Sequence, residues 1–128
     1  MHNTEGAIGY VEFAYASRNN LTTVLLRNHA GENVEASQKS FAQAASSADW
    51  QHADHFAVDL LDTPGQGAWP IVSATYVLVP LAPADAARSK AVKKFFTWGF
   101  EKGDSLATGL DYVTLPPAVK TSILSSWK

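Results

Sequence analysis

The chain has 128 residues, of which 46% are hydrophobic and 17% are charged, and its formal net charge is −2. This length is enough for one domain with a real core, and the composition is that of a soluble globular protein and not of a disordered one. The charge balance argues against nucleic acid as a partner, and the absence of cysteine excludes disulfides and thiolate zinc sites.

The first thirty residues alternate short apolar segments with turns. Residues 7–11 and 21–26 predict two short strands, because both are apolar and contain β-branched side chains. A helical turn is expected between them, beginning at residues 13–16 and closing at residues 19–20. Residues 28–31 predict a further turn, whose final glycine suits a positive φ.

A helix and a long strand are expected in the middle of the chain. Ser37 is a good N-cap, and small apolar residues recur behind it at helical spacing, so this helix can pack closely against a sheet. Residues 71–79 form the clearest strand, with apolar or small side chains on both faces. Such a strand is expected to lie centrally, covered on both sides, in a layered α/β architecture.

Two helices are expected to complete the chain. The first begins near Pro83, Asp85 complements its N-terminal dipole, and Gly103 either caps or kinks it. The second begins at residues 115–117 and carries apolar side chains as far as Trp127. No internal repeat, low-complexity tract or linker interrupts the chain, which favours one compact unit.

Residue chemistry offers weak candidates for a site. His52 and His55 lie three positions apart beside aspartates, and imidazoles at this spacing can bind zinc. The stretch lacks a helical pattern and a downstream third ligand, so a solvated loop is the preferred interpretation. No serine occupies a Gly-x-Ser-x-Gly elbow. The hydrolase alternative therefore needs a Ser–His–Asp relay that only folding would bring together. We expect no metal, no cofactor and no enzymatic activity.

The four tryptophans have the side chains that stack ligands best. Core packing is the default expectation for at least three of them. Trp69 stands apart, because it lies beside glycine-rich sequence and directly before Pro70. It is the candidate for a residue of a cleft or hinge.

Five stretches, taken together and in order, resemble one protein family. They are residues 6–16, residues 40–45 with 48–50, residues 68–71, residues 94–98 and residues 110–116. Their succession is similar to the C-terminal part of bacterial periplasmic phosphate-binding proteins, the receptors of phosphate-importing ABC transporters. Five stretches in order at similar spacing are a specific signal, and they cover nearly the whole chain.

The resemblance implies part of a type II periplasmic binding-protein fold, in which two α/β lobes close around the anion at a hinge. Residues 1–65 would finish the second lobe, and residues 66–71, with Trp69, would form the hinge crossing. Residues 72–128 would add a C-terminal strand and helices that complete the first lobe. The family's phosphate ligands lie mostly upstream of the matched region, so no residue of this chain is assigned to phosphate.

For the intact protein, the resemblance implies inorganic phosphate as the ligand, the ABC transporter permease as a partner and the periplasm as the location. Residues 1–6 are polar and the apolar run 77–83 is short, so we expect neither a signal peptide nor membrane insertion. An absent N-terminal half would explain both the missing signal and the missing ligands. The alternative is a self-associating or partner-binding module without phosphate affinity, because a piece of two lobes leaves strand edges uncovered.

Overall fold

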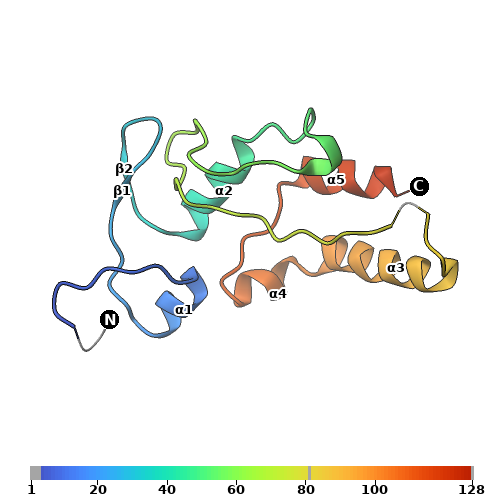
Figure 1. The fold of residues 1–128 in the computed structure, drawn as a ribbon, viewed down its shortest axis with the longest axis horizontal. Helices are drawn as coiled ribbons and strands as arrows, with labels where there is room; N and C mark the ends of the chain where they lie inside the picture. The colour runs from blue at the N-terminus through green and yellow to red at the C-terminus, as the bar shows by residue number, and fades with distance from the viewer. Residues whose placement is uncertain (1–3, 81, 128) are drawn as a thin grey trace.

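The computed structural model describes residues 4–80 and 82–127. Its elements are α1 (Phe13–Arg18), β1 (Leu26–Arg27), β2 (Asn33–Val34), α2 (Gln38–Ser46), a short 3-10 helix (Asp54–Phe56), α3 (Ala86–Lys102), α4 (Asp104–Gly109) and α5 (Pro117–Ser126). The described part of the chain is thus a mixture of helix and sheet. Figure 1 shows α1 and the two strands at one end of an elongated molecule, and α3 and α5 at the other.

The N-terminal region confirms the expected turns but not the expected strands. α1 ends at the predicted asparagine pair, and Asn20 has a φ of +50°. β1 and β2 pair antiparallel around residues 28–31, where Gly31 has a φ of +81°. The strand predicted over residues 7–11 is wrong, because this segment is extended and exposed without a strand partner, and only Leu26 of the predicted segment 21–26 lies in a strand.

α2 begins as the sequence predicts. The Ser37 side chain accepts a hydrogen bond from the backbone N–H of Ser40, whose hydroxyl in turn accepts from the backbone N–H of Ser37. This reciprocal capping box satisfies donors that a helix start would otherwise leave unpaired. Ala44 and Ala45 are buried on the face that the small residues predicted.

Trp50 lies at the centre of the core. It is buried together with Ala45, Leu60 and Val119, and its Nε1 donates a hydrogen bond to the carbonyl of Ala45 at 2.7 Å. Partly buried apolar side chains pack around this cluster: Ala48, Phe56, Val58, Val72, Ala74, Leu115 and Ile123. Among the described residues no large side chain is completely buried, so the core is small for a chain of this length.

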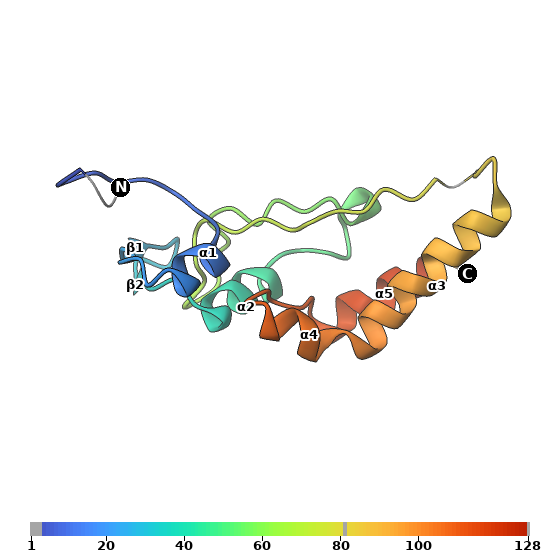
Figure 2. The ribbon, with the colours of Figure 1, turned by 90° about the horizontal axis from the view of Figure 1, so that it is seen from below.

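The strand predicted over residues 71–79 is extended but belongs to no sheet in this chain. Figures 1 and 2 show it running first beside residues 57–62 and then on toward the start of α3. Val72 and Ala74 pack against the core, whereas Ile71, Ser73 and other residues of the opposite face are exposed. A strand needs neighbours whose main chains pair with it. No other segment of residues 4–80 and 82–127 pairs with this one. The prediction of a central strand covered on both sides is therefore wrong here.

α3 begins at Ala86, so Pro83 precedes the helix and is not in its first turn as expected, whereas Gly103 caps it as expected. The carboxylate of Asp85 accepts from the backbone N–H of Arg88 at the start of α3. Gly103 is the C-cap of α3 and also the N-cap of α4. A Cβ added there would lie 2.5 Å from the carbonyl oxygen of Gly99. The absence of a side chain thus lets the chain turn sharply between the two helices.

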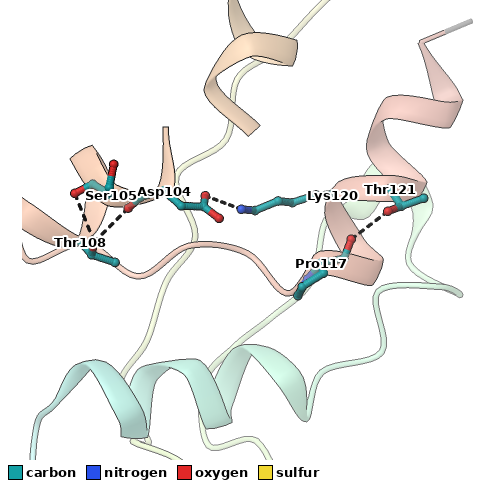
Figure 3. A network of polar contacts seen from close by, with 6 residues as sticks. All are labelled: Asp104, Ser105, Thr108, Pro117, Lys120 and Thr121. Atoms are coloured by element: carbon teal, nitrogen blue, oxygen red, sulfur yellow. Dashed lines mark hydrogen bonds and ion pairs between the residues drawn. The ribbon is translucent and has the colours of Figure 1, made fainter. Parts of the chain in front are cut away.

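One ion pair joins α4 to α5 (Figure 3). Lys120 of α5 donates a hydrogen bond to the carboxylate of Asp104 at the start of α4, and the lysine side chain is mostly buried. The Thr108 hydroxyl donates back to the carbonyl of Asp104 at 3.0 Å, within the same helix. The Thr108 bond thus stabilises α4 itself, and the Asp104–Lys120 ion pair links α4 to α5. Within the described ranges, no helix combines the length and the apolar character that crossing a bilayer would require.

Candidate hinge crossing at Trp69

The predicted crossing, residues 66–71, is bonded to the turn between β1 and β2. The backbone N–H of Gly67 donates to a carboxylate oxygen of Glu32 at 2.6 Å. The side-chain amide of Asn28 donates to the carbonyl oxygen of Ala68 at 3.2 Å, and both of these residues are buried. Two consecutive residues of the crossing are therefore held by side chains from a single turn.

Asn28 is the organising residue of this contact. Its backbone N–H donates to the carbonyl of Glu32, and its side-chain oxygen accepts from the backbone N–H of Glu32, both at 2.9 Å. Its amide nitrogen then lies 3.3 Å from the Glu32 carboxylate as well as within reach of Ala68. An amide carries both donors and an acceptor, so one asparagine closes its own turn and also binds the neighbouring segment.

Trp69 contacts α2 through a backbone hydrogen bond and through its indole ring. Its backbone N–H donates to the carbonyl of Ser40 at 3.0 Å. Its half-buried indole meets the edge of Phe41, with ring centroids 6.4 Å apart at 72°, and Phe41 in turn meets Phe13 at 5.0 Å and 80°. These edge-to-face contacts join α1, α2 and the crossing in one aromatic row.

Gly65 allows the loop before the crossing to approach α2. A Cβ added at Gly65 would lie 2.9 Å from the Cβ of Ser47, at the C-terminal end of α2. The loop closes through a backbone hydrogen bond from Asp62 to the carbonyl of Pro70 at 2.9 Å. The crossing therefore starts from a loop whose backbone contacts the helix without room for a side chain.

Gly65→Ala is expected to destabilise the chain by about 1–3 kcal/mol, because the new methyl group forces the loop away from Ser47. The measurement is urea unfolding followed by circular dichroism. Gly99→Ala is the control: an added Cβ meets nothing within 4 Å inside α3, so this change is expected to stabilise by about 0.5–1 kcal/mol. Equal effects of the two changes would contradict the proposed close approach.

The structure does not bring the histidines into a shared site. His52 contacts the carboxylate of Asp49 at 2.8 Å on the surface, and this hydrogen bond lowers the pKa of the Asp49 carboxyl below its usual value. His55 lies 3.4 Å from Asp54, also on the surface. Among residues 4–80 and 82–127, no three histidine or acidic side chains are placed to hold a metal ion together.

A hydrolase relay has no geometric support in the described part of the chain. His29 lies 3.4 Å from the Asp62 carboxylate, and both side chains are exposed. None of the hydrogen bonds between described residues joins a histidine ring to a serine hydroxyl. The histidine contacts are thus surface pairs with aspartate.

The sequence indicated Trp69 but missed the residues that bind the crossing. Asn28 was predicted only as a turn residue, and Glu32 and the carbonyl of Ser40 carried no signal. An asparagine at the first position of a turn is the one available indication, because its side chain commonly bonds to nearby backbone. Its bond to Ala68, forty positions away, depends on tertiary structure.

Comparison with known sequences finds phosphate-binding proteins. It also finds two putative serine/threonine-protein kinase/receptors of Acanthamoeba polyphaga mimivirus, 30% and 27% identical over 75% of this chain. The chain is 45% identical over 123 residues, 96% of its length, to the phosphate-binding protein PstS of Xylella fastidiosa (strain Temecula1) and covers 34% of that protein. It is 41% identical over 122 residues to PstS of Haemophilus influenzae, covering 36% of it. It is also 32% identical over 133 residues to PstS of Methanocaldococcus jannaschii, covering 33% of it. No protein-family model matches the chain.

The three PstS relatives are phosphate-binding proteins. The chain belongs to their family, PstS, as the five ordered stretches predicted. It spans about a third of the length of these three relatives.

Proposed function

We propose that the chain is the C-terminal part of a phosphate receptor of an ABC importer, and that it supplies scaffold and hinge instead of anion ligands. The observation that carries the proposal is the match to PstS proteins over 96% of this chain and 34% of the relative. In this proposal inorganic phosphate is the ligand of the complete protein, the ABC permease is its partner and the periplasm is its location. The role is binding and delivery, not catalysis.

Within the complete receptor we propose that residues 1–65 finish the second lobe, residues 66–71 form the hinge crossing and residues 72–128 complete the first lobe. The bonds of Gly67 and Trp69 support a crossing that is attached firmly to the part of the chain preceding it. Such attachment suits a hinge, because the φ/ψ changes of closure then fall on the few residues that follow it.

The chain by itself has one core that spans this proposed boundary. Val119 of α5 packs with Ala45, Trp50 and Leu60 from the other side of the crossing. The lobe assignment therefore concerns the complete receptor, in which the remaining two thirds of the polypeptide would give each part a core of its own.

Calorimetric titration with inorganic phosphate tests the proposal. The isolated chain is expected to show no tight binding, because the resemblance implies that the phosphate ligands lie mostly upstream of the matched region. The complete Haemophilus influenzae relative, titrated in the same buffer, is the positive control. Sub-micromolar binding by the isolated chain would overturn the placement of the ligands.

A self-associating module is the second candidate. The observation that favours it is the exposure of large apolar side chains, such as Ile8 at 83% and Leu78 at 94%. Exposed apolar surface on this scale promotes association in water. Light scattering across a concentration series distinguishes the two candidates, because a stable monomer at high concentration counts against self-association.

A further inference from the structure

Positive charge is concentrated in the first half of α3. The chain has 10 lysine and arginine residues and a formal net charge of −2, yet four of its cations lie close together on this helix: Arg88, Lys90, Lys93 and Lys94. No ion pair between described residues involves any of the four, whereas Arg18 and Lys120 each face an aspartate. The cluster therefore presents positive charge that no carboxylate of residues 4–80 and 82–127 pairs with.

This placement does not stabilise the helix itself. The N-terminal end of a helix carries partial positive charge and favours acidic side chains, and cations are favourable at the C-terminal end. Lys90 and Lys94 are also four positions apart, a spacing at which like charges repel each other on one helix face. Residues that break a local rule of this kind are expected where they have a function.

Three of these cations border a groove between α3 and α5, with a volume of about 670 Å³. Lys90, Lys93 and Lys94 line it from α3, and Leu124 and Trp127 line it from the α5 side. Glu101 is the one acidic side chain among the described residues of its lining. We call this feature the α3/α5 groove. Its walls are partly apolar and its rim is mainly basic.

The two sides of the α3/α5 groove are joined to each other at Trp127. The Lys93 Nζ donates to the carbonyl oxygen of Trp127 at 3.4 Å. The indole of Trp127 also contacts the ring of Phe100, with centroids 5.9 Å apart. The half-buried Lys93 is thus held by its own chain, while Lys90 and Lys94 are exposed and free to meet a partner.

The α3/α5 groove is separate from the exposed aromatic surface of α3. Phe95 and Trp98 are 62% and 49% exposed, and neither lines the groove. Positions three, four and seven apart share one face of a helix, so residues 86, 90, 93 and 97 face α5 together while residue 95 points away from them. A partner in the groove would therefore leave the apolar surface of the self-association candidate untouched.

We propose that the α3/α5 groove docks an acidic, amphipathic segment of a partner protein. The rim lysines pair with carboxylates along such a segment, and the walls at Leu124 and Trp127 accept its apolar side chains. The volume lies within the range of about 300–1000 Å³ that ligand pockets span, which gives room for several side chains. The groove belongs to this chain alone, so its docking role is independent of phosphate binding by the complete protein.

Other anionic partners fit the α3/α5 groove less well. A bilayer presents a broad surface and cannot enter a concave site, whereas one face of a helix can. A second copy of this chain lacks a suitable segment, because α1, α2 and α5 contain no acidic residue. The acid of α4, Asp104, is already paired with Lys120.

The test is fluorescence anisotropy with a labelled synthetic peptide of two Leu-Glu-Glu-Leu-Leu-Glu-Glu repeats. We expect it to bind at least about tenfold more tightly than two control peptides, one with Lys in place of Glu and one with Ala in place of Leu. The double variant Lys90→Glu with Lys94→Glu is expected to weaken binding by about tenfold or more. Arg27→Glu with Lys39→Glu makes the same change in net charge at exposed positions outside the groove and is expected to leave binding unchanged.

Circular dichroism checks that both double variants are folded. If the Lys90 and Lys94 variant does not fold, the three peptides measured on the unchanged chain decide the question. Equal binding of the three peptides, or equal losses in the two double variants, would show attraction by overall charge and overturn the docking site.

Vesicles of phosphatidylglycerol and analytical ultracentrifugation test the other occupants. Vesicle binding that needs Lys90 and Lys94, without discrimination among the peptides, would assign the lysines to a lipid surface and overturn the proposal. Self-association that the Lys90 and Lys94 variant abolishes would make a second copy the occupant and would also overturn it.

Discussion

Trp50→Ala is expected to lower the free energy of unfolding by about 3–5 kcal/mol, the typical cost of removing a buried aromatic side chain. The indole packs against Leu60 and Val119, and its N–H donates to the carbonyl of Ala45. The change therefore leaves a cavity and an unpaired carbonyl in a core that has few other large members. Whole domains are stable by only about 5–15 kcal/mol, so the variant is expected to lose its cooperative transition in urea.

Trp98→Ala is the matched control for this experiment. Trp98 lies on α3 with 49% of its surface exposed and contacts Phe95 at a centroid distance of 6.2 Å. Its removal from the isolated chain is expected to cost less than about 1 kcal/mol, because about half of its surface is already in contact with water. Circular dichroism is the common readout, since both changes remove an indole. Similar losses for the two variants would contradict the core placed around Trp50.

Asn28→Ala is expected to destabilise the chain by about 2–3 kcal/mol, because it leaves the buried carbonyl of Ala68 without its donor. The carbonyl of Ala68 loses the donor that reaches it from the turn, and the backbone N–H of Glu32 loses its acceptor. Hydrogen exchange should show the local consequence directly. The amides of Gly67 and Trp69 are expected to exchange faster, because the crossing is no longer bonded to the turn.

Asn19→Ala is the control that tests whether the destabilisation expected of Asn28→Ala depends on the burial of Asn28. Asn19 is exposed, and its amide donates to the carbonyl of Tyr15 at the end of α1. Its replacement is expected to cost less than about 1 kcal/mol and to leave the amides of the crossing unaffected. Unchanged exchange at Gly67 in Asn28→Ala would contradict the assignment of Asn28 as the residue that holds the crossing.

Local features of the fold were predictable because their causes lie within a few residues. Ser37 caps α2 through Ser40, three positions later, and Gly31 supplies the positive φ of its own turn. Gly103 was predicted to cap or kink, and it ends one helix while it begins the next. In each case the hydrogen bond or dihedral angle is complete within one turn of chain.

The predicted strands at residues 7–11 and 71–79 failed for the opposite reason. Their composition favours extended backbone, and both segments are extended. A strand becomes part of a sheet only when another main chain lies beside it, and the described residues provide none at these two places. Composition therefore predicted the local conformation correctly and the pairing incorrectly.

The sequence by itself determined the family and helix caps such as that of α2, because motif order and local hydrogen bonding are properties of the chain. Only the tertiary structure showed that Asn28 and Glu32 bind the crossing, since these contacts join residues 35 to 40 positions apart. It also showed that residues 71–79 pack against the core at Val72 and Ala74, whereas the pattern predicted two fully covered faces. A pattern of apolar side chains on both faces predicts that a strand is buried on both sides. Whether it is buried depends on the segments that pack beside it in the tertiary structure.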